Sequence, residues 1–596
     1  LLSGVAGAFF RPLAFTIAAS LVISYLIAAF AVPAAVRAVE RRKERRPARK
    51  PIDRPSRFDR SVRFTVAHPW IPAIAAAVLL GGGFLLYRLI GTDFLPEMDE
   101  GSIILDYQTP FGTSLTDTNA MLNEIERRVI GPMPDVQTYS RRTGTQLGFF
   151  ITEANSGDYV IKLKPRAQRR AADEVIDDLR HKIAQMEPAI RTDFGQLLED
   201  NIGDLSGGTP QPIDVKIFGE NQALLQQRAR RIAQIVKGVQ GVEDVFDGIT
   251  IAGPALNIRV RPAAGVSVPK AAPASPAASA PATAQVSEPA RFGLTTEDIH
   301  EAVEPAIAGT VAGNLRIGER LYNIRVFARS EGALSDVPIR TPSGALLPLS
   351  ALASVETGPP EAEIDRDNLK TYLGVTARLS GRSLGSAVSE IRGKLESGLP
   401  LGAGESLRFG GLYEQQQASF KGLLVVLLAG LLLVGVIVLF EFGDWRAPVL
   451  TILVALAVLT GVFGALMATG MTFNISSFVG AIFMVGIVGE KSVFLIQAGR
   501  QELESGKPPR EAWAAAAGGH GRFRPVAETT LATGFALAPL AFAIGEGSQL
   551  LQPLAIAVIG GFVLSGALVL YVLPSLYAWL DPHGRLARPR AGTSPP

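Results

Sequence analysis

Three ionisable residues interrupt long apolar stretches of the sequence, where a charge is costly. Glu490 and Lys491 lie within FVGAIFMVGIVGEKSVFLI, and Glu528 lies one turn inside the next apolar stretch, beside Thr529 and Thr530. A charged side chain at the centre of a membrane costs about 2.5–3.5 kcal/mol on insertion scales, so such residues usually serve transport. Burial favours the neutral form of a carboxyl group and a nearby cation favours the charged form. A carboxylate that changes partners can therefore take up and release protons, which predicts proton-coupled transport.

The position of the pair along its helix bears on this prediction. Glu490 follows Ile475 by 15 residues, which corresponds to roughly 22 Å of helix and places the pair toward the cytoplasmic half of its span. Neighbouring helix positions point about 100° apart, so Glu490 and Lys491 do not face each other and one of them should reach a neighbouring span. The alternative is a static network in which Glu490, Lys491 and Glu528 lock helices together.

A second set of acids lies where an apolar stretch gives way to polar sequence. Asp93, Glu97, Asp99 and Glu100 fall close together, and such a cluster either attracts cations or forms a solvated junction. A soft metal would favour thiolate, thioether or imidazole ligands, but the sequence has no cysteine. The other candidates outside the membrane are scattered: His181, His300, Met98, Met121, Met133 and Met186. No metal site is predicted.

Catalytic and nucleotide-binding motifs are absent from the sequence. It contains no P-loop, no Ser-His-Asp order and no His-Glu-x-x-His. Gly81-Gly-Gly-Phe lies within an apolar stretch and indicates helix packing rather than a phosphate loop. The charges nearly balance, with 58 Lys and Arg against 55 Asp and Glu, which argues against nucleic acid as a partner. We therefore expect neither an enzyme nor a cofactor.

Seven segments are long and apolar enough to cross a membrane as helices, which takes roughly 20 residues. They are 13–36, 69–90, 421–441, 447–469, 475–497, 525–545 and 552–577. The last five form a bundle over 421–580 with almost no polar interval between them, which argues against the alternative of buried helices in a soluble protein. The sequence thus predicts a polytopic α-helical membrane protein.

The basic residues fix the orientation of these segments. Residues 37–68, between the first two segments, form a loop rich in Lys and Arg, which the positive-inside rule places in the cytoplasm. Alternation then places 91–420 outside and the tail 581–596 inside, and basic residues in the loop 498–524 agree. The sequence opens at Leu1 in apolar sequence without a signal peptide, so we expect a fragment whose N-terminal part is missing.

The large outer segment alternates strand and helix patterns, which is typical of split βαβ units in ferredoxin-like domains. Strands are predicted at 103–108, 159–164, 213–218, 256–260, 321–326 and 372–377, and helices at 115–129, 172–186, 222–236 and 384–395. The stretch 263–290 consists mostly of Ala, Pro, Ser and Val. Such a composition predicts a semi-extended linker without a core of its own.

Five motifs, in the correct order, resemble the resistance–nodulation–division (RND) superfamily of efflux transporters. GAFFRPLAFTIAASLVISYLIAAFAVP resembles the sixth span of those pumps, and FLPEMDEG at 94–101 the junction after the seventh. GIVGEKS from Gly486 resembles the tenth span, RFRPVAET from Arg522 the start of the eleventh, and GEGS with PLAIAVIGG from Pro553 the link into the twelfth. The chain resembles the C-terminal half of such a permease. The style of 94–164 is closer to the heavy-metal branch than to the drug branch.

The resemblance implies a domain plan. Residues 1–36 and 69–90 would be the sixth and seventh of twelve spans, and the five helices of 421–580 the remainder. The periplasmic region 91–420 would contain ferredoxin-like porter subdomains and a docking subdomain. The first porter subdomain would be 96–208, the second 209–262 with 365–415, and the docking part 307–360, with 263–290 as a linker.

The resemblance also implies a function and partners. Such permeases sit in the bacterial inner membrane among its lipids and export small molecules or cations in exchange for protons. They form homotrimers that work with a periplasmic adaptor (membrane-fusion) protein and an outer-membrane channel. The identity of the cargo, metal cation or organic compound, is left open by the sequence.

Proton-relay positions follow residue by residue. Glu490 occupies a position that is Lys in drug-type pumps and Glu in metal-type pumps, whereas Lys491 falls where the family commonly has Asn. Glu528 falls where drug-type pumps commonly have Met, and Arg522 and Thr529 match relay-associated positions. The main acidic partner in this family lies on the fourth span, which the sequence lacks, so the isolated chain is not expected to pump.

Two alternatives belong to other classes of function. The first is a truncated, non-transporting scaffold that anchors a periplasmic domain. The second is a protein-translocation or lipid-transfer relative with the same membrane core. The Glu490–Lys491 pair favours transport over a scaffold, and the large α/β segment favours export over translocation. Arg522 could also be a simple cytoplasmic anchor.

Overall fold

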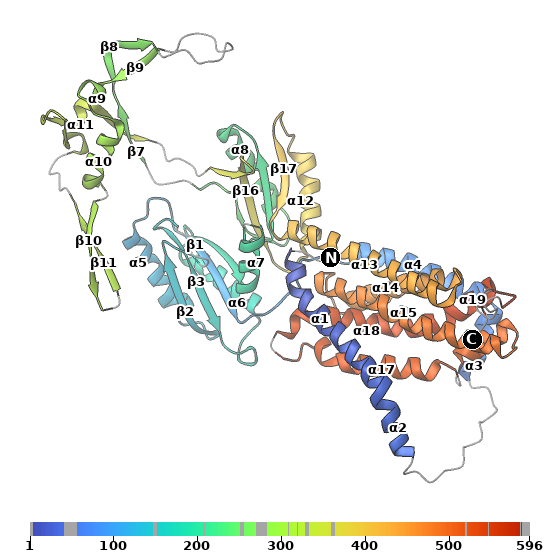
Figure 1. Ribbon diagram of the computed structural model, residues 1–596. Coiled ribbons are helices and arrows are strands. Elements are labelled where there is room, and N and C mark those ends of the chain that lie inside the picture. The colour runs from blue at the N-terminus through green and yellow to red at the C-terminus, as the bar shows by residue number, and fades with distance from the viewer. Residues whose placement is uncertain are drawn as a thin grey trace. The chain divides into compact units, whose positions relative to one another are not determined.

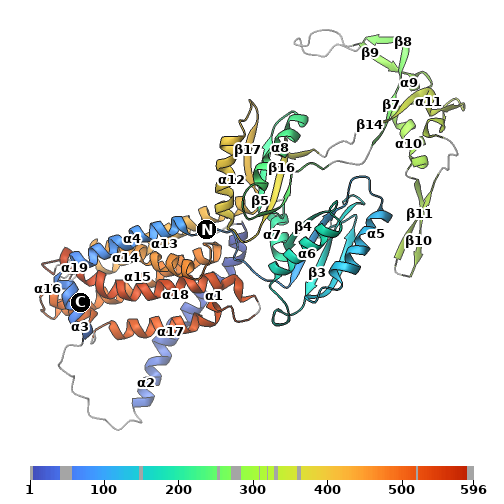
Figure 2. The same ribbon diagram turned by 180° about the vertical axis from the view of Figure 1, so that it is seen from behind.

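The computed structural model places most of the chain in two compact units (Figures 1 and 2). One unit comprises Leu1–Ile249 with Ile364–Pro596, and the other Thr250–Glu363. The structure describes residues 4–40, 57–146, 152–207, 209–250, 255–269, 283–307, 309–318, 320–327, 333–358, 364–518, 521–545, 547–584 and 586.

Six helical segments of the described residues are long and apolar enough to cross a membrane. The first, Phe10–Arg37, runs through α1 (Gly4–Leu26), η1 (Ile27–Ala31) and α2 (Val32–Glu40). The next four are α4 (Trp70–Leu89), α13 (Gly411–Phe442), α14 (Arg446–Ala468) and α15 (Ile475–Glu504). The last, Ser548–Leu580, runs through η5 (Ser548–Leu551), α18 (Gln552–Ala567), η6 (Leu568–Val572) and α19 (Leu573–Leu580). The predicted class of polytopic α-helical membrane protein is confirmed.

The predicted number of seven spans differs from these six at one place. The segment expected at 525–545 is a helix, α17 (Phe523–Ala541), whose 19 residues are long enough for the same criterion but not apolar enough. Its first turns carry Arg524 and Glu528 together with threonines, and these polar residues lower the mean hydropathy of the helix. It nevertheless lies beside α18 in the bundle (Figure 1).

Small residues let the helices of the bundle approach closely, as is common in membranes. A Cβ atom added at Gly461 of α14 would lie 2.5 Å from the carbonyl oxygen of Gly560 in α18. One added at Gly83 of α4 would lie 2.6 Å from Oγ1 of Thr460 in α14. The packing role predicted for the glycines of α4 is therefore confirmed at Gly83.

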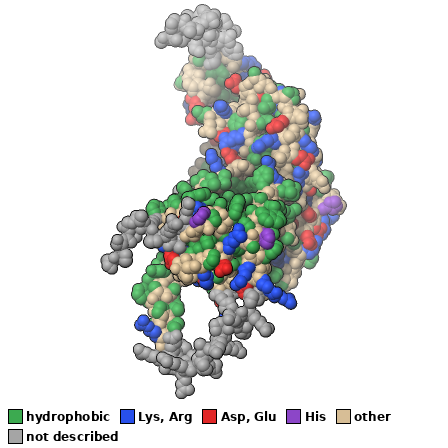
Figure 3. Space-filling view, turned by 90° about the vertical axis from the view of Figure 1, so that its right-hand side faces the viewer, with side chains coloured by type: hydrophobic (Ala, Val, Ile, Leu, Met, Phe, Trp, Pro, Cys, Tyr) green, Lys and Arg blue, Asp and Glu red, His purple; other side chains and the backbone are tan. Residues whose placement is uncertain are grey.

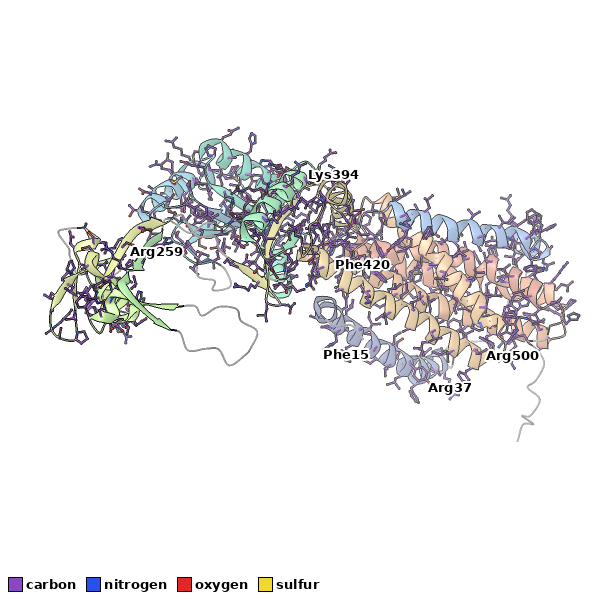
Figure 4. All side chains as sticks on the ribbon, turned by 90° about the horizontal axis from the view of Figure 1, so that it is seen from above. Phe15, Arg37, Arg259, Lys394, Phe420 and Arg500 are labelled. Carbon is purple, nitrogen blue, oxygen red and sulfur yellow. The ribbon has the colours of Figure 1, made fainter. Side chains whose placement is uncertain are left out.

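The two ends of the bundle differ in their surroundings. Phe420, near the start of α13, lies at the end next to the α/β sheets, whereas Arg500 of α15 lies at the opposite end (Figure 4). At that opposite end, α3 (Arg57–Ala67) and α16 (Pro509–Ala517) pack together. The end-on view shows Lys and Arg side chains among hydrophobic ones on this face (Figure 3).

The first α/β subdomain is a ferredoxin-like βαββαβ unit. Its elements are β1 (Ser102–Gln108), α5 (Leu115–Ile125) with η2 (Glu126–Ile130), β2 (Val136–Thr143), β3 (Ser156–Leu163), α6 (Ala172–Met186) and β4 (Arg191–Gln196). The antiparallel sheet has the order β2-β3-β1-β4. Alternate residues of β1, including Leu105 and Tyr107, enter the core beneath the helices. The residues between them, including Asp106, therefore face the other side of the sheet.

The second subdomain repeats this topology. It comprises β5 (Ile213–Phe218), α8 (Gln222–Lys237), β6 (Val242–Phe246), β15 (Asp365–Asp367), β16 (Lys370–Leu379), α12 (Leu384–Gly398) and β17 (Ser406–Gly410). The sheet order is β15-β16-β5-β17, and β6 also pairs with β16. Between the two subdomains lies α7 (Leu197–Gly207). The strands and helices predicted for this part of the sequence are confirmed.

The other unit, Thr250–Glu363, has its own core. It contains β7 (Ala255–Val260) paired with β14 (Ala353–Gly358), together with α9 (Glu288–Arg291), α10 (Thr296–Ile307) and α11 (Leu349–Leu352). Its remaining pairs are β8 (Pro262–Pro269) with β9 (Thr283–Ser287), β10 (Thr310–Ile317) with β11 (Arg320–Val326), and β12 (Pro338–Arg340) with β13 (Leu346–Pro348). The predicted linker 263–290 thus contributes two paired strands, and its middle, 270–282, lies outside the described residues.

Candidate functional site

Lys491 joins three helices through its ammonium group. Its side chain is 6% exposed, and Nζ donates to Oγ1 of Thr530 on α17 at 3.0 Å and to Oγ of Ser565 on α18 at 3.0 Å. The same nitrogen lies 4.4 Å from the centroid of the Phe562 ring, within the range of a cation–π contact. Neutral groups therefore surround a basic side chain deep in the bundle.

Local sequence features place these groups together. The helix that carries Lys491 begins with a capping box between Asn474 and Ser477, which fixes its start. Phe562 and Ser565 are three residues apart in α18, so they lie on one face of that helix. Sequence reasoning placed Thr530 beside Glu528 but gave it no role.

Glu490 lies on a different side of α15 from Lys491. Its side chain is exposed, and so are Gly486 and Phe494, four residues before and after it. These positions form an uncovered stripe along one face of the helix. Among the described residues, Glu490 makes no ion pair with Lys491 or Glu528, so the static ion-pair network considered above is not observed there.

The other residues predicted for a proton relay lie near the start of α17. Glu528 pairs with Arg524 of the same helix at 2.7 Å, and both side chains are largely exposed. Arg522 lies with its guanidinium carbon 5.9 Å from the centroid of the Phe494 ring. Thr529 donates its hydroxyl to the carbonyl of Val526. Lys491 thus forms hydrogen bonds from α15 to both α17 and α18, whereas no such pair of hydrogen bonds to neighbouring helices is formed by Glu528, Thr529 or Arg522 among the described residues.

Three of the four acids at the junction after α4 tie structural elements together. The carboxylate of Asp93 accepts from the backbone N–H of Leu384 at 2.6 Å, and burial raises its pKa. Asp99 accepts from both terminal nitrogens of Arg169, one at 2.8 Å. Burial opposes ionisation of Asp99, but the Arg169 guanidinium outweighs it and lowers the pKa of that carboxyl.

Glu100 and Glu97 complete this junction. Glu100 accepts from the backbone N–H of Leu198 at 2.7 Å, in the first turn of α7, and burial raises its pKa. Glu97 is exposed. Within the described part of the chain, no group of three His, Asp or Glu side chains is arranged to hold a metal ion. The junction therefore offers negative charge without a ready coordination sphere.

A row of three aspartates crosses the first sheet, and sequence reasoning missed it. In the strand register, Asp106 of β1 stands directly opposite Asp158 of β3 on one side and Asp193 of β4 on the other. Arg142 donates two hydrogen bonds to Asp158, at 2.8 and 2.7 Å. Arg378 donates two to Asp193, at 2.7 and 2.9 Å. The outer two aspartates are thus each neutralised by an arginine.

The middle member of this row lacks such a pair. Among the described residues, Asp106 has neither an ion pair nor a side-chain hydrogen bond of its own. Burial, followed by the charges of Asp200 and Asp193, raises the pKa of Asp106 well above its ordinary value. Like charges directly opposite each other destabilise a sheet. The raised pKa favours the protonated form of Asp106, and the charge of Arg378, which lowers the pKa, offsets this only in part.

Arg378 connects this row to an acidic cavity between the two α/β subdomains. Besides Asp193, its guanidinium reaches Asp200 at 3.5 Å and Glu199 at 3.8 Å. Glu199 and Arg378 both line a cavity of about 420 Å³. Its other charged lining residues are Asp93, Glu97, Glu100, Asp173, Asp177, Arg180 and Arg382. Acids outnumber arginines there, so the cavity favours cations.

Comparisons with known proteins agree with this architecture. The family model described as the AcrB/AcrD/AcrF family matches residues 1–268 and 275–581. The chain is 28% identical to the cobalt-zinc-cadmium resistance protein CzcA of Cupriavidus metallidurans, over 97% of this chain and 53% of that protein. It is 30% identical to the nickel and cobalt resistance protein CnrA of the same organism, over 88% of this chain and 48% of that one.

A solved structure gives the same result for the fold. The crystal structure of a heavy metal efflux pump superposes with a TM-score of 0.71 and 26% identity, covering 88% of this chain and 51% of that one. The chain thus spans about half the length of the curated relatives it matches. Members of the matched family are transporters rather than enzymes. The chain belongs to the AcrB/AcrD/AcrF family of RND efflux transporters.

Proposed function

We propose that this chain is the C-terminal half of a permease that exports a divalent metal cation in exchange for protons. The observation that carries the proposal is Asp106, which lies between Asp158 and Asp193 and makes no ion pair among the described residues. A divalent cation in this row would replace the proton of Asp106, so binding of cargo and release of a proton would be one event. The names of the matched relatives, which refer to resistance to cobalt, zinc, cadmium and nickel, support this class of cargo.

The cargo would enter through the acidic cavity. The carboxylates of the cavity would attract a hydrated cation. Arg378 lines this cavity and also pairs with Asp193, so it lies between the cavity and the aspartate row. Carboxylate oxygens suit divalent cations such as Zn²⁺, whereas Cu⁺ and Ag⁺ prefer thiolates and thioethers. Since no three carboxylates converge in the described residues, the cation would be held in transit rather than as a resident metal.

The membrane helices would supply the energy. We assign proton transfer to Glu490 and Lys491, with Glu528, Thr529 and Arg522 as further members of the relay. The exposed stripe around Glu490 supports this assignment, because an ionisable residue on an uncovered face needs a partner element. That element would come from the part of a full-length permease that this chain does not contain.

The family supports a further set of proposals. The permease would lie in the bacterial inner membrane, with its α/β sheets in the periplasm. It would form a homotrimer and work with a periplasmic adaptor protein and an outer-membrane channel. The acids Asp93, Asp99 and Glu100 would serve mainly as junction residues, and Glu97 would attract cations at the entrance.

Metal binding by the purified chain tests the cargo assignment. Calorimetric titration with Zn²⁺, Co²⁺ and Ni²⁺ in lipid nanodiscs should show binding that Asp106→Asn weakens at least tenfold. Asp178→Asn is the matched control, because Asp178 lies in the same subdomain but pairs with Lys182 and Arg170 on the surface. Equal affinity of Asp106→Asn and the parent chain would rule out this route.

Metal tolerance tests the coupling. A host that lacks its own exporters, expressing the full permease that carries this chain, should tolerate zinc, cobalt or nickel. Glu490→Gln should abolish that tolerance at unchanged protein level. Tolerance that survives Glu490→Gln would remove this residue from the relay. Tolerance that never appears would favour the scaffold alternative.

A further inference from the structure

We propose that Thr530 and Ser565 are positioning residues for Lys491, an assignment that rests on the proton-coupled function above. The hydroxyl group of each residue donates its hydrogen to a backbone carbonyl of its own helix. Thr530 donates to the carbonyl of Val526 at 2.7 Å, and Ser565 donates to the carbonyl of Phe562 at 2.9 Å. Each hydroxyl can therefore only accept from Lys491.

This arrangement suits a group that gains and loses a proton. An ammonium group has three N–H donors, and here two point to hydroxyl oxygens while the Phe562 ring takes the third direction. A neutral amine keeps two donors, which are enough for the same two oxygens. Lys491 can therefore change its protonation state while it keeps both hydrogen bonds to Thr530 and Ser565, and neither hydroxyl group has to rotate.

Among the described residues, Lys491 makes no ion pair. On its own helix the nearest charge is Glu490, which acts on Lys491 electrostatically although its side chain lies on another side of the helix. On α17 the charged residues are Arg522, Arg524 and Glu528, and the last two pair with each other on the exposed side. The helix α18 contains no ionisable residue. The charged residues of α13 and α14 are Glu414, Lys421, Glu441 and Arg446, which lie near the ends of those helices.

The contact also bears on how α17 is held. Val526 is the only buried side chain that the described part of α17 contributes, and the helix packs mainly on α18. The hydrogen bond from Lys491 to Thr530 adds a polar link from α15 to this lightly buried helix. Thr530 therefore positions Lys491 and at the same time connects the helix that carries Glu528 to the helix that carries Glu490.

The accessibility of the Lys491 amine tests the proposal directly. The purified chain in nanodiscs is treated with a membrane-permeant amine-acylating reagent, and modification is followed by mass spectrometry. The exposed Lys421 serves as the internal reference. Thr530→Val and Ser565→Ala should each raise the labelling rate of Lys491 at least threefold, because each frees the amine from one acceptor. Thr530→Ser should restore the parent rate.

Two matched variants separate positioning from general loosening. Thr533→Val removes another hydroxyl of α17, three residues further along the helix, and Ser575→Ala removes a buried serine of the final span that donates to the carbonyl of Tyr571 in the same span. Both should leave the rate unchanged. Unchanged rates in Thr530→Val and Ser565→Ala, or equal rises in all four variants, would overturn the proposal. The labelling does not involve metal, so its failure is distinct from failure of the cation-export proposal.

Discussion

Lys491 in the helix bundle and Asp106 in the first α/β sheet are both ionisable residues without an ion pair among the described residues. Lys491 is surrounded by hydroxyls and an aromatic ring, which accept it in either protonation state. Asp106 stands between two other aspartates, and its burial, together with the charges of Asp200 and Asp193, raises its pKa and so disfavours its charged form. The comparison contrasts a bundle site whose hydrogen bonds fit either protonation state with a sheet site whose surroundings favour a proton or, as we propose, another cation in its place.

The largest effect should come from breaking the charge balance of the sheet. Arg378→Met leaves Asp193 and Asp200 without their shared cation, which should lower the free energy of unfolding by about 3–5 kcal/mol. Denaturation of the purified chain in detergent measures this. Arg408→Met, at a half-exposed ion pair, is the control and should change little. A small change in the free energy of unfolding by Arg378→Met would mean that Arg378 does not neutralise the charges of Asp193 and Asp200.

Removing the middle charge should act in the opposite direction. Asp106 has a raised pKa in the folded state, so its contribution to stability is present at acid pH and is lost as the pH rises through that pKa. Asp106→Asn should therefore stabilise the chain above neutral pH by on the order of 1 kcal/mol, since it removes two like-charge contacts. The gain should vanish near pH 4. A gain independent of pH would contradict the charge argument.

Removing the lysine should cost less than removing the arginine. Lys491→Met keeps most of the side-chain volume and leaves only hydroxyls that still donate to their own helices. The expected loss is about 2 kcal/mol, since Lys491 donates two hydrogen bonds with a net value of about 1 kcal/mol each. Thermal unfolding in nanodiscs measures it. A loss of unfolding free energy as large as that of Arg378→Met would show that Lys491 neutralises a buried carboxylate. The bundle site and the sheet site would then no longer differ in this respect.

The smallest effect is expected at Glu528. Its partner Arg524 belongs to the same helix, and both side chains are largely exposed, so solvent screens the pair. Glu528→Gln should leave the unfolding temperature of the chain unchanged. Reduced metal tolerance of the full permease at unchanged stability would keep Glu528 in the relay, whereas unchanged tolerance would remove it.

The sequence predicted those features that depend on local pattern. Apolar length located the spanning helices, and the charges of Glu490 and Lys491 directed attention to the part of α15 where Lys491 contacts α17 and α18. Six of the seven predicted spans meet the criterion of length and composition, and α17 does not, because Arg524 and Glu528 lower its hydropathy. Alternation of strand and helix patterns predicted the α/β sheets correctly.

The contacts between elements could not be predicted in this way. Thr530 and Ser565 become partners of Lys491 only through the packing of α17 and α18. The aspartate row requires the register of three strands, and β4 was not predicted at all. The sequence did contain one signal for this site, because Asp106 interrupts the apolar strand IILDYQ. An ionisable residue within an otherwise apolar strand indicates a structural or functional role.

The edge of the second sheet has one further consequence. Both β6 and β15 run antiparallel to β16, β6 beside residues 376–379 and β15 beside residues 370–372. The strands β6 and β15 therefore pair with successive parts of β16, as two parts of one edge strand would. The unit Thr250–Glu363 is inserted in the sequence between them. Only the width of about three residues, roughly 10 Å, separates the two strands. A short glycine bridge should close this gap, so the sheet should fold with the inserted unit cut out.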